Sequence, residues 1–160
     1  PAEDEKTFRG QELRGYVHDQ GAALLGGVGG HAGLFGTADD VAKMMQMYLQ
    51  KGYYGGTWYL QPQAIQLFNT CNYCTEGNRR GLGFDKPQLG KAGPTCGCVP
   101  MESFGHTGFT GTFAWVDPIN EIVIVFLSNR TYPSAENKLL INKLVRQRVQ
   151  EVVYKAITND

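Results

Sequence analysis

The chain has 160 residues, the size of one ordinary domain, which is enough to bury roughly two-thirds of the unfolded surface. Fifteen basic residues balance fifteen acidic ones, so no net charge favours binding to nucleic acid or to an anionic membrane. No apolar run approaches the ~20 residues of a membrane span, and the start lacks the basic and apolar regions of a signal peptide. The chain does not begin with Met, and we expect it to be a mature or excised piece.

Residues 1–36 show neither helical nor strand periodicity and are dense in glycine. Such a segment inside a domain is functional or is the remnant of something larger, and we favour the remnant. Its glycines do not form a phosphate loop, because no Gly-Lys-Ser/Thr follows them and no strand precedes them. His18 and His31 are candidate ligands or bases, although histidines in glycine-rich loops more often tie two stretches of backbone together.

Thr37 begins the clearest predicted helix. Its hydroxyl can cap the first turn together with Asp40, three residues later, and Gly52 marks the end. The Gly-Gly pair within residues 53–59 predicts a short hairpin, and Pro62 opens a short helix to about Phe68.

Residues 69–100 are mostly loop, with a possible short strand over residues 80–84. The four cysteines lie here, as Cys71-x-x-Cys74 and Cys96-x-Cys98. Two close pairs are compatible with a four-thiolate zinc site, although Cys-x-Cys is tighter than the usual spacing. One or two disulfides that staple a surface loop are the favoured alternative, and free thiols are the third.

Residues 103–128 predict an antiparallel hairpin. Its second part, residues 122–127, is a continuous apolar run, which predicts a strand in the middle of a sheet that is covered on both faces. Ser134 is then a candidate cap for a long amphipathic helix through about Ile157, which should lie on that sheet. The predicted fold is therefore α/β (α+β), with no repeat and no linker.

The polar triplet His106-Thr107-Gly108 is the best candidate for chemistry, but no nucleophile accompanies it. The chain contains three serines, Ser103, Ser128 and Ser134, and none begins a Ser-x-x-Lys or lies in a Gly-x-Ser-x-Gly motif. No pair of carboxylates lies in a context that suggests glycosidase chemistry. The sequence therefore predicts half of an active site at most.

That half resembles a known family. The segment from Gly105 to Pro118, with its apolar second strand, is similar to the third active-site motif of the serine β-lactamase and penicillin-binding-protein superfamily. There the triplet is usually Lys-Thr-Gly, with His-Thr-Gly as a variant. Residues 30–43 resemble the helix start that follows the second motif of that superfamily. Four further stretches resemble the β-lactamase-like module at the C-terminus of bacterial family 3 glycoside hydrolases named β-N-acetylglucosaminidase: residues 15–19, 25–27, 78–87 and 129–133.

The resemblance implies that residues 1–160 are the C-terminal fragment of a β-lactamase-like serine hydrolase domain. The helical half and the Ser-x-x-Lys segment would then lie before residue 1, and the helix at Thr37 would belong to that half. The parent would be an exported or periplasmic enzyme that forms an acyl-enzyme with an ester, amide or peptide substrate of the cell wall. The fragment would be inactive alone, would need no cofactor, and would self-associate through its truncated face.

The resemblance also implies a role for each residue of the site. His106 would replace the cationic lysine, which makes its charge dependent on pH near neutrality, and Thr107 would bind a substrate carboxylate. Gly108 would keep the strand smooth, and the backbone amide of Phe109 would be one of two oxyanion donors. Three alternatives remain: His106 and Thr107 form only an exposed strand edge, the module binds peptidoglycan-like ligands or proteins without catalysis, or it is a zinc-stabilised adaptor.

Overall fold

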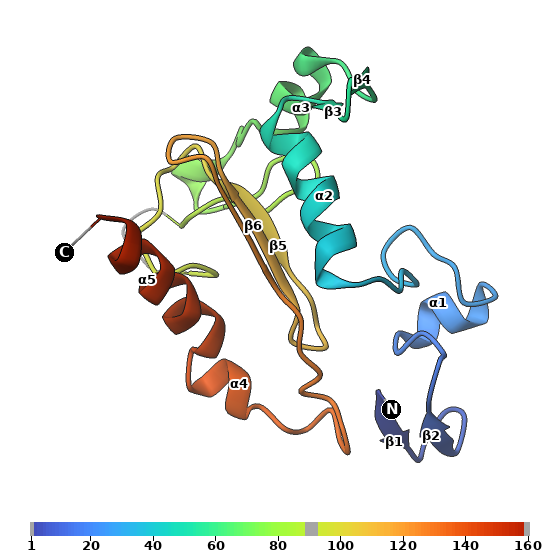
Figure 1. Ribbon diagram of the computed structural model, residues 1–160. Helices are drawn as coiled ribbons and strands as arrows, with labels where there is room; N and C mark the ends of the chain where they lie inside the picture. Colours follow the sequence, from blue (N-terminus) through green and yellow to red (C-terminus); the bar gives the residue numbers. More distant parts are fainter. Residues whose placement is uncertain (1, 89–92, 159–160) are drawn as a thin grey trace.

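The computed structural model describes residues 2–88 and 93–158, arranged around a three-stranded antiparallel sheet (Figure 1). The sheet has the order β5-β6-β7, from β5 (Phe104–Thr107), β6 (Phe113–Asp117) and β7 (Ile122–Phe126). This confirms the predicted antiparallel arrangement of residues 103–128.

The middle strand is β6, so the prediction that the apolar run of residues 122–127 lies at the centre of the sheet is wrong. Trp115 of β6 pairs with Gly105 on one side and with Ile124 on the other. Within the described part of the chain, β7 pairs only with β6. The apolar character of β7 comes instead from burial of both its faces, since Val123 packs in one core cluster and Ile124 in another.

Helix α2 (Ala38–Leu49) covers one face of the sheet (Figure 1). The predicted cap is confirmed: Thr37 Oγ1 accepts a hydrogen bond from the Asp40 amide at 3.2 Å, and the Asp40 carboxylate accepts one from the Thr37 amide at 3.0 Å. Met45 packs with Phe104 and Val116 of the sheet. The helix at Thr37 therefore belongs to the packing of this sheet, because its apolar stripe is buried there.

The opposite face is covered by α5 (Val145–Thr158), as predicted for the C-terminal helix (Figure 1). Tyr154 packs there with Phe113, Trp115 and Ile124. The Tyr154 hydroxyl donates a hydrogen bond to the buried carboxylate of Asp117 at the end of β6.

The predicted single helix from Ser134 is wrong in its first part. It is divided into a short α4 (Leu139–Asn142) and α5, with Leu144 between them at a φ of 52°. Residues 134–138 form a loop. The Arg130 guanidinium accounts for this loop. Its Nη1 atom donates hydrogen bonds to the carbonyl oxygens of Ala135 and Asn137, at 2.8 and 2.9 Å. These two bonds hold the segment in a non-helical conformation.

The short elements of the middle of the chain agree with the predictions. Strands β3 (Tyr53–Tyr54) and β4 (Thr57–Trp58) form the hairpin, and α3 spans Pro62–Asn69. A 3₁₀ turn, η1 (Cys74–Glu76), follows. None of the helices in the described ranges is both long and apolar enough to cross a membrane.

The N-terminal segment contains short regular elements and is bonded to the rest of the chain. It contains a hairpin of β1 (Glu3–Glu5) and β2 (Gln11–Leu13) and a short helix α1 (Gln20–Leu24) capped by Asp19. Thr131 donates its hydroxyl proton to the carbonyl of Ala2 at 2.6 Å, and the Asp4 amide donates to the carbonyl of Pro133 at 2.9 Å. These bonds tie the start of the chain to the segment after β7.

Candidate functional site

The triplet lies at the end of β5, where the chain turns back into β6. His106 is exposed and Thr107 is half-buried. Gly108 starts the turn: its amide donates to the Thr112 carbonyl at 2.8 Å, and its own carbonyl accepts from the Gly111 amide at 3.1 Å. A Cβ atom on Gly108 would lie 2.0 Å from the Thr112 hydroxyl oxygen, so any larger residue here would have to displace the Thr112 side chain. Gly108 thus lies directly after β5, at the start of the turn, and its role in keeping the strand smooth for a substrate stays a prediction.

One stretch of the outer edge of β5 is open. Asp85 and Gly105 exchange two backbone hydrogen bonds of 2.8 and 3.1 Å, so the loop before the sheet covers the edge at Gly105. The predicted strand over residues 80–84 is reduced to a single bridge between Arg80 and Asp85. In a β-strand, the amide and carbonyl of every second residue point to the same edge. After Gly105, the next backbone groups of β5 that face the outer edge are therefore those of Thr107. Since no described residue pairs with Thr107 on that side, the edge left uncovered by the described ranges begins at Thr107.

A buried carboxylate organises the charges beside the triplet. Asp85 is fully buried and forms ion pairs with Arg79 at 2.6 Å and Arg80 at 3.0 Å. Arg80 Nη1 also lies 3.2 Å from Nε2 of His106. A guanidinium has donors only, so the ring nitrogen of His106 must accept, and the proton of the neutral ring then sits on Nδ1. The permanent cation beside the triplet is Arg80, not His106.

The sequence alone does not indicate a role for Arg80. The stretch 78–87 contributes to the family resemblance, but Arg80 and His106 are 26 positions apart, and no sequence pattern indicates that they are in contact. The only signal is that Arg79 and Arg80 lie close in sequence to Asp85, and this is also common on solvated surfaces.

The next residue, Lys86, carries a buried ammonium group. Its Nζ atom donates to the Glu102 carbonyl at 2.8 Å and to the Asn69 side-chain oxygen at 3.1 Å. Burial lowers the pKa of Lys86 to about 8, although the nearby Glu102 carboxylate acts in the opposite direction. These contacts tie the loop to the end of α3, outside the triplet.

Phe109 follows the triplet, and its ring contacts an imidazole, that of His18, and a guanidinium, that of Arg130. Its ring stacks on His18 with centroids 5.6 Å apart, and the guanidinium carbon of Arg130 lies 4.5 Å from its centroid. The Phe109 amide donates a hydrogen bond to no residue of the described ranges. That amide is the one that the family resemblance assigns as an oxyanion donor.

The turn at Phe109 borders a cavity of about 1210 Å³. The other side of the cavity is formed by the N-terminal segment, including His18 and His31. Each histidine contacts a carboxylate: Nε2 of His18 lies 2.8 Å from Glu3, and Nε2 of His31 lies 2.9 Å from Asp19. Hydrogen bonds from the Ala22 amide and from His31 hold the pKa of Asp19 below its ordinary value. Both histidines therefore fit the structural role, because each ties loop segments together.

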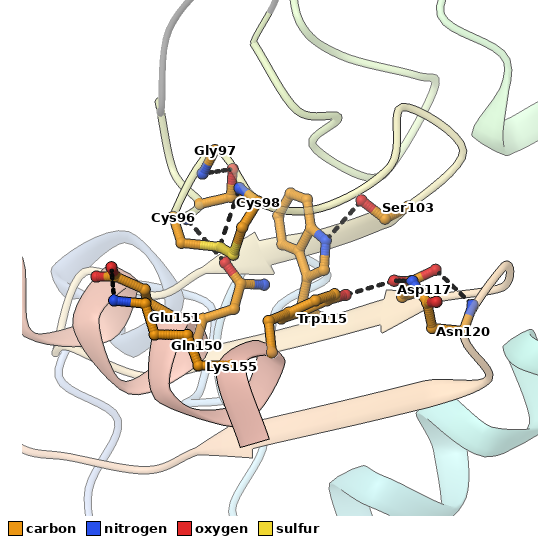
Figure 2. The surroundings of a disulfide bond; sticks show 12 residues. Cys96, Gly97, Cys98, Ser103, Trp115, Asp117, Asn120, Gln150, Glu151 and Lys155 are labelled. Carbon is orange, nitrogen blue, oxygen red and sulfur yellow. Dashed lines mark hydrogen bonds and ion pairs between the residues drawn. A yellow bond between two sulfur atoms is a disulfide. The ribbon is translucent and has the colours of Figure 1, made fainter. Parts of the chain in front are cut away.

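Within the described residues, none of the three serines is placed to act as a nucleophile. Ser103 is fully buried and accepts a hydrogen bond from the Trp115 indole at 2.9 Å (Figure 2). Ser128 lies beneath the turn, where its hydroxyl oxygen would be 2.5 Å from a Cβ on Gly111. Ser134 accepts a bond from the Glu136 amide at 3.2 Å.

The cysteines form two disulfides, Cys71–Cys74 and Cys96–Cys98. The second lies beside α5, where the Cys96 amide donates to Gln150 at 2.9 Å (Figure 2). Within the described ranges, no three His, Cys, Asp or Glu side chains are grouped to hold a metal. The zinc alternative is therefore wrong for this structure, since all four sulfurs are in disulfide bonds.

Comparison with known proteins agrees with this architecture. The family model described as beta-lactamase matches residues 2–146. A protein of Escherichia coli K12 named "Putative D-alanyl-D-alanine carboxypeptidase" is 38% identical over 128 residues, which are 79% of this chain and 29% of that protein. The protein of the same name from Salmonella enteritidis PT4 is 36% identical over 151 residues, which are 92% of this chain and 34% of that protein.

A solved structure, "Crystal structure of putative beta-lactamase from Bacteroides dorei DSM 17855", has a TM-score of 0.42 and 18% identity, covering 79% of this chain and 48% of that one. The chain thus spans about a third of the length of the curated relatives it matches. The match of one family model to residues 2–146 and the identity to these relatives show that the chain belongs to the beta-lactamase family.

Proposed function

We propose that this chain forms one wall of the active site of a serine hydrolase that cleaves cell-wall peptides through an acyl-enzyme. The observation that carries the proposal is the contact of Arg80 with His106, next to the open edge at Thr107. The names of the relatives support a substrate that ends in D-alanine, and such a peptide has a free carboxylate.

In this proposal the substrate carboxylate binds to Arg80 and to the Thr107 hydroxyl. A guanidinium binds a carboxylate through two parallel N–H bonds, and Arg80 remains charged at every physiological pH. His106, as the neutral acceptor of the Arg80 bond, orients the guanidinium toward the edge. The substrate backbone would then pair with Thr107 as an added strand.

The Phe109 amide supplies one oxyanion donor, and the amide of the nucleophilic residue supplies the other. The nucleophile is proposed to be a serine of a Ser-x-x-Lys motif in a part of the protein outside these 160 residues. The chain alone is therefore proposed to be inactive. It uses no cofactor.

Three further parts of the proposal rest on sequence resemblance. The parent is proposed to be exported to the periplasm and to carry a family 3 glycoside hydrolase module of the β-N-acetylglucosaminidase type. Its partner is a peptide-like cell-wall substrate.

The isolated chain is proposed to self-associate, because several large apolar side chains of the N-terminal segment are exposed: Leu24, Leu25, Val28, Leu34 and Phe35.

The proposal is tested by acylation of the full-length protein. We expect a fluorescent β-lactam to label it covalently, a peptide ending in D-alanyl-D-alanine to compete, and the same peptide with a C-terminal amide to compete poorly. The 160-residue chain should not be labelled. If the full-length protein binds the peptide but is never acylated and hydrolyses nothing, the module is a binding domain and the proposed chemistry is wrong.

A further inference from the structure

Two arginines hold the carbonyl groups of the turn between β5 and β6. Arg146 of α5 donates from Nη1 to the carbonyl oxygens of Gly108 and Thr112, at 3.3 and 3.2 Å. Arg130 donates from Nε to the Phe109 carbonyl at 2.7 Å and from its own amide to the Thr110 carbonyl at 2.8 Å. Four carbonyl groups of one five-residue turn are therefore held by these two residues.

These bonds fix the direction of the Phe109 amide. The peptide unit between Gly108 and Phe109 is planar and trans, so the Phe109 N–H points opposite to the Gly108 carbonyl. That carbonyl points at Arg146 and at the Gly111 amide inside the turn. The Phe109 N–H is therefore directed out of the turn, where it meets no acceptor within the described residues. Arg130 fixes the next peptide unit in the same way.

The charge of the pair is not neutralised nearby. Arg130 is buried and Arg146 is half-buried, and neither forms an ion pair with a carboxylate in the described ranges. Burial lowers the pKa of Arg146, and the neighbouring Arg130 guanidinium adds to this effect. Placing two like charges together without a carboxylate is unfavourable for folding, but it creates a positive potential at the turn.

We infer that Arg146 and Arg130 are positioning residues: they aim the Phe109 N–H outward and place positive charge behind it, so that the turn stabilises an oxyanion. This inference rests on the proposed serine hydrolase function. An oxyanion donor is effective only when its direction is set before the reaction, because no energy is then spent on reorientation in the transition state. Arg146 acts through Gly108 and does not itself contact the substrate.

Arg146→Met in the full-length protein separates this role from a structural one. Loss of one oxyanion donor lowers kcat by about 10²–10³, so loss of its alignment should lower the acylation rate constant at least about tenfold. The dissociation constant of the substrate before acylation should not change, because the ground-state contacts at Arg80 and Thr107 remain. Affinity for a boronic acid, which forms a tetrahedral adduct, should fall in parallel with the acylation rate.

Two further variants complete the test. Arg148→Met, on the same helix but exposed, should acylate at the wild-type rate. Arg146→Lys keeps the positive charge and one donor group, so it should recover part of the acylation rate. It also replaces the Met variant in the test if that variant does not fold. An unchanged rate and boronate affinity in both Arg146 variants would overturn the inference, as would equal losses in substrate binding and rate.

A second readout does not depend on the chemistry. In protein labelled with ¹⁵N-phenylalanine, the Phe109 amide should become more mobile in Arg146→Met, while its order parameter should stay at the wild-type value in Arg148→Met. If wild-type protein is never acylated, the proposed function fails, and this measurement still decides whether Arg146 fixes the amide. An unchanged Phe109 order parameter in Arg146→Met would refute the positioning role by itself.

Discussion

The Nη1 atom of Arg80 lies 3.2 Å from Nε2 of His106, although the residues are 26 positions apart. Arg80 is also paired through Nη1 with the buried Asp85 at 3.0 Å, so the guanidinium is anchored, although half of the side chain is exposed. The strand end at His106 therefore has a permanent cation, Arg80, beside it. The positive charge is supplied from a different segment of the chain.

This arrangement predicts that Arg80→Met weakens binding of peptides with a free C-terminal carboxylate. A hydrogen bond to a charged group contributes about 1.5–3 kcal/mol, and Arg80 is half-exposed, so we expect KM to rise about tenfold. Peptides with a C-terminal amide should be affected far less. Arg14→Met, an exposed arginine of the N-terminal hairpin, is the control. Equal effects on both peptides would show that Arg80 does not bind the carboxylate.

Because the Lys86 ammonium group is buried, we expect the free energy of unfolding to rise with pH above neutrality. Its pKa is about 8 in the folded chain and about 10.4 in an unfolded one, so the unfolded state binds more protons between these values. The cost of the buried charge is fully present below pH 8 and is relieved as the pH rises through 8. Between pH 7.5 and 9.5 the free energy of unfolding by urea should increase by about 1–2 kcal/mol.

Lys86→Met removes the titrating group and is the control for this rise. The variant should show a flatter profile over the same window, in which the tyrosines and most other lysines remain protonated. A rise of the same size in the variant would assign the effect to another group.

Tyr154→Phe should destabilise the fold through Asp117. Burial alone would raise the pKa of Asp117, but hydrogen bonds from Asn120 and Tyr154 and from two backbone amides outweigh it and hold the pKa below its ordinary value. A depressed carboxyl pKa gives stability that is present above the unfolded pKa and is lost as the pH falls through the folded one. Removing the donor from a buried carboxylate should cost about 1–3 kcal/mol.

The matched control is Tyr132→Phe. The Tyr132 hydroxyl also contacts a carboxylate, that of Glu12 at 3.2 Å, but the pair is exposed. Urea unfolding at pH 7 should show little change for this variant. If Tyr132→Phe and Tyr154→Phe lowered the free energy of unfolding by similar amounts, burial of Asp117 would not be the reason for the loss.

The two disulfides should differ in their contribution to stability. Each closes a very short loop, for which the constraint on the unfolded state is about 1–2 kcal/mol. Paired serine substitutions at Cys96 and Cys98 should cost more than those at Cys71 and Cys74, because the Cys96 side chain packs against the core. Thiol titration of denatured, unreduced protein should find no free thiol, and EDTA should leave Tm unchanged. A stoichiometric zinc ion in the purified protein would restore the zinc interpretation.

The exposed apolar side chains of the N-terminal segment predict that the 160-residue chain self-associates. Leu34 is 93% exposed, and replacing it by Glu should shift the chain toward monomer without loss of Tm. Sedimentation velocity over a range of concentrations measures this. A monomeric wild-type chain at every concentration would remove the basis for the proposal.

Local sequence signals were sufficient for several elements. The cap at Thr37, the Gly-Gly hairpin after Gly52 and the start of α3 at Pro62 follow from backbone preferences that act within a few residues. The predicted helix at Ser134 failed because Arg130 takes carbonyl groups that a helix would use, and this contact cannot be read from helical periodicity.

The sequence by itself determined the triplet 106–108, the family resemblance and the absence of a Ser-x-x-Lys motif in these residues. Only the tertiary structure decided that β6 is the middle strand, that Gly108 starts a turn, and that Arg80 is the cation beside His106. The physical reason is that motifs and caps depend on neighbouring residues, whereas strand order and charge pairs depend on packing. Packing brings together Arg80, His106 and Arg146 from segments whose spacing in the sequence carries no signal of contact.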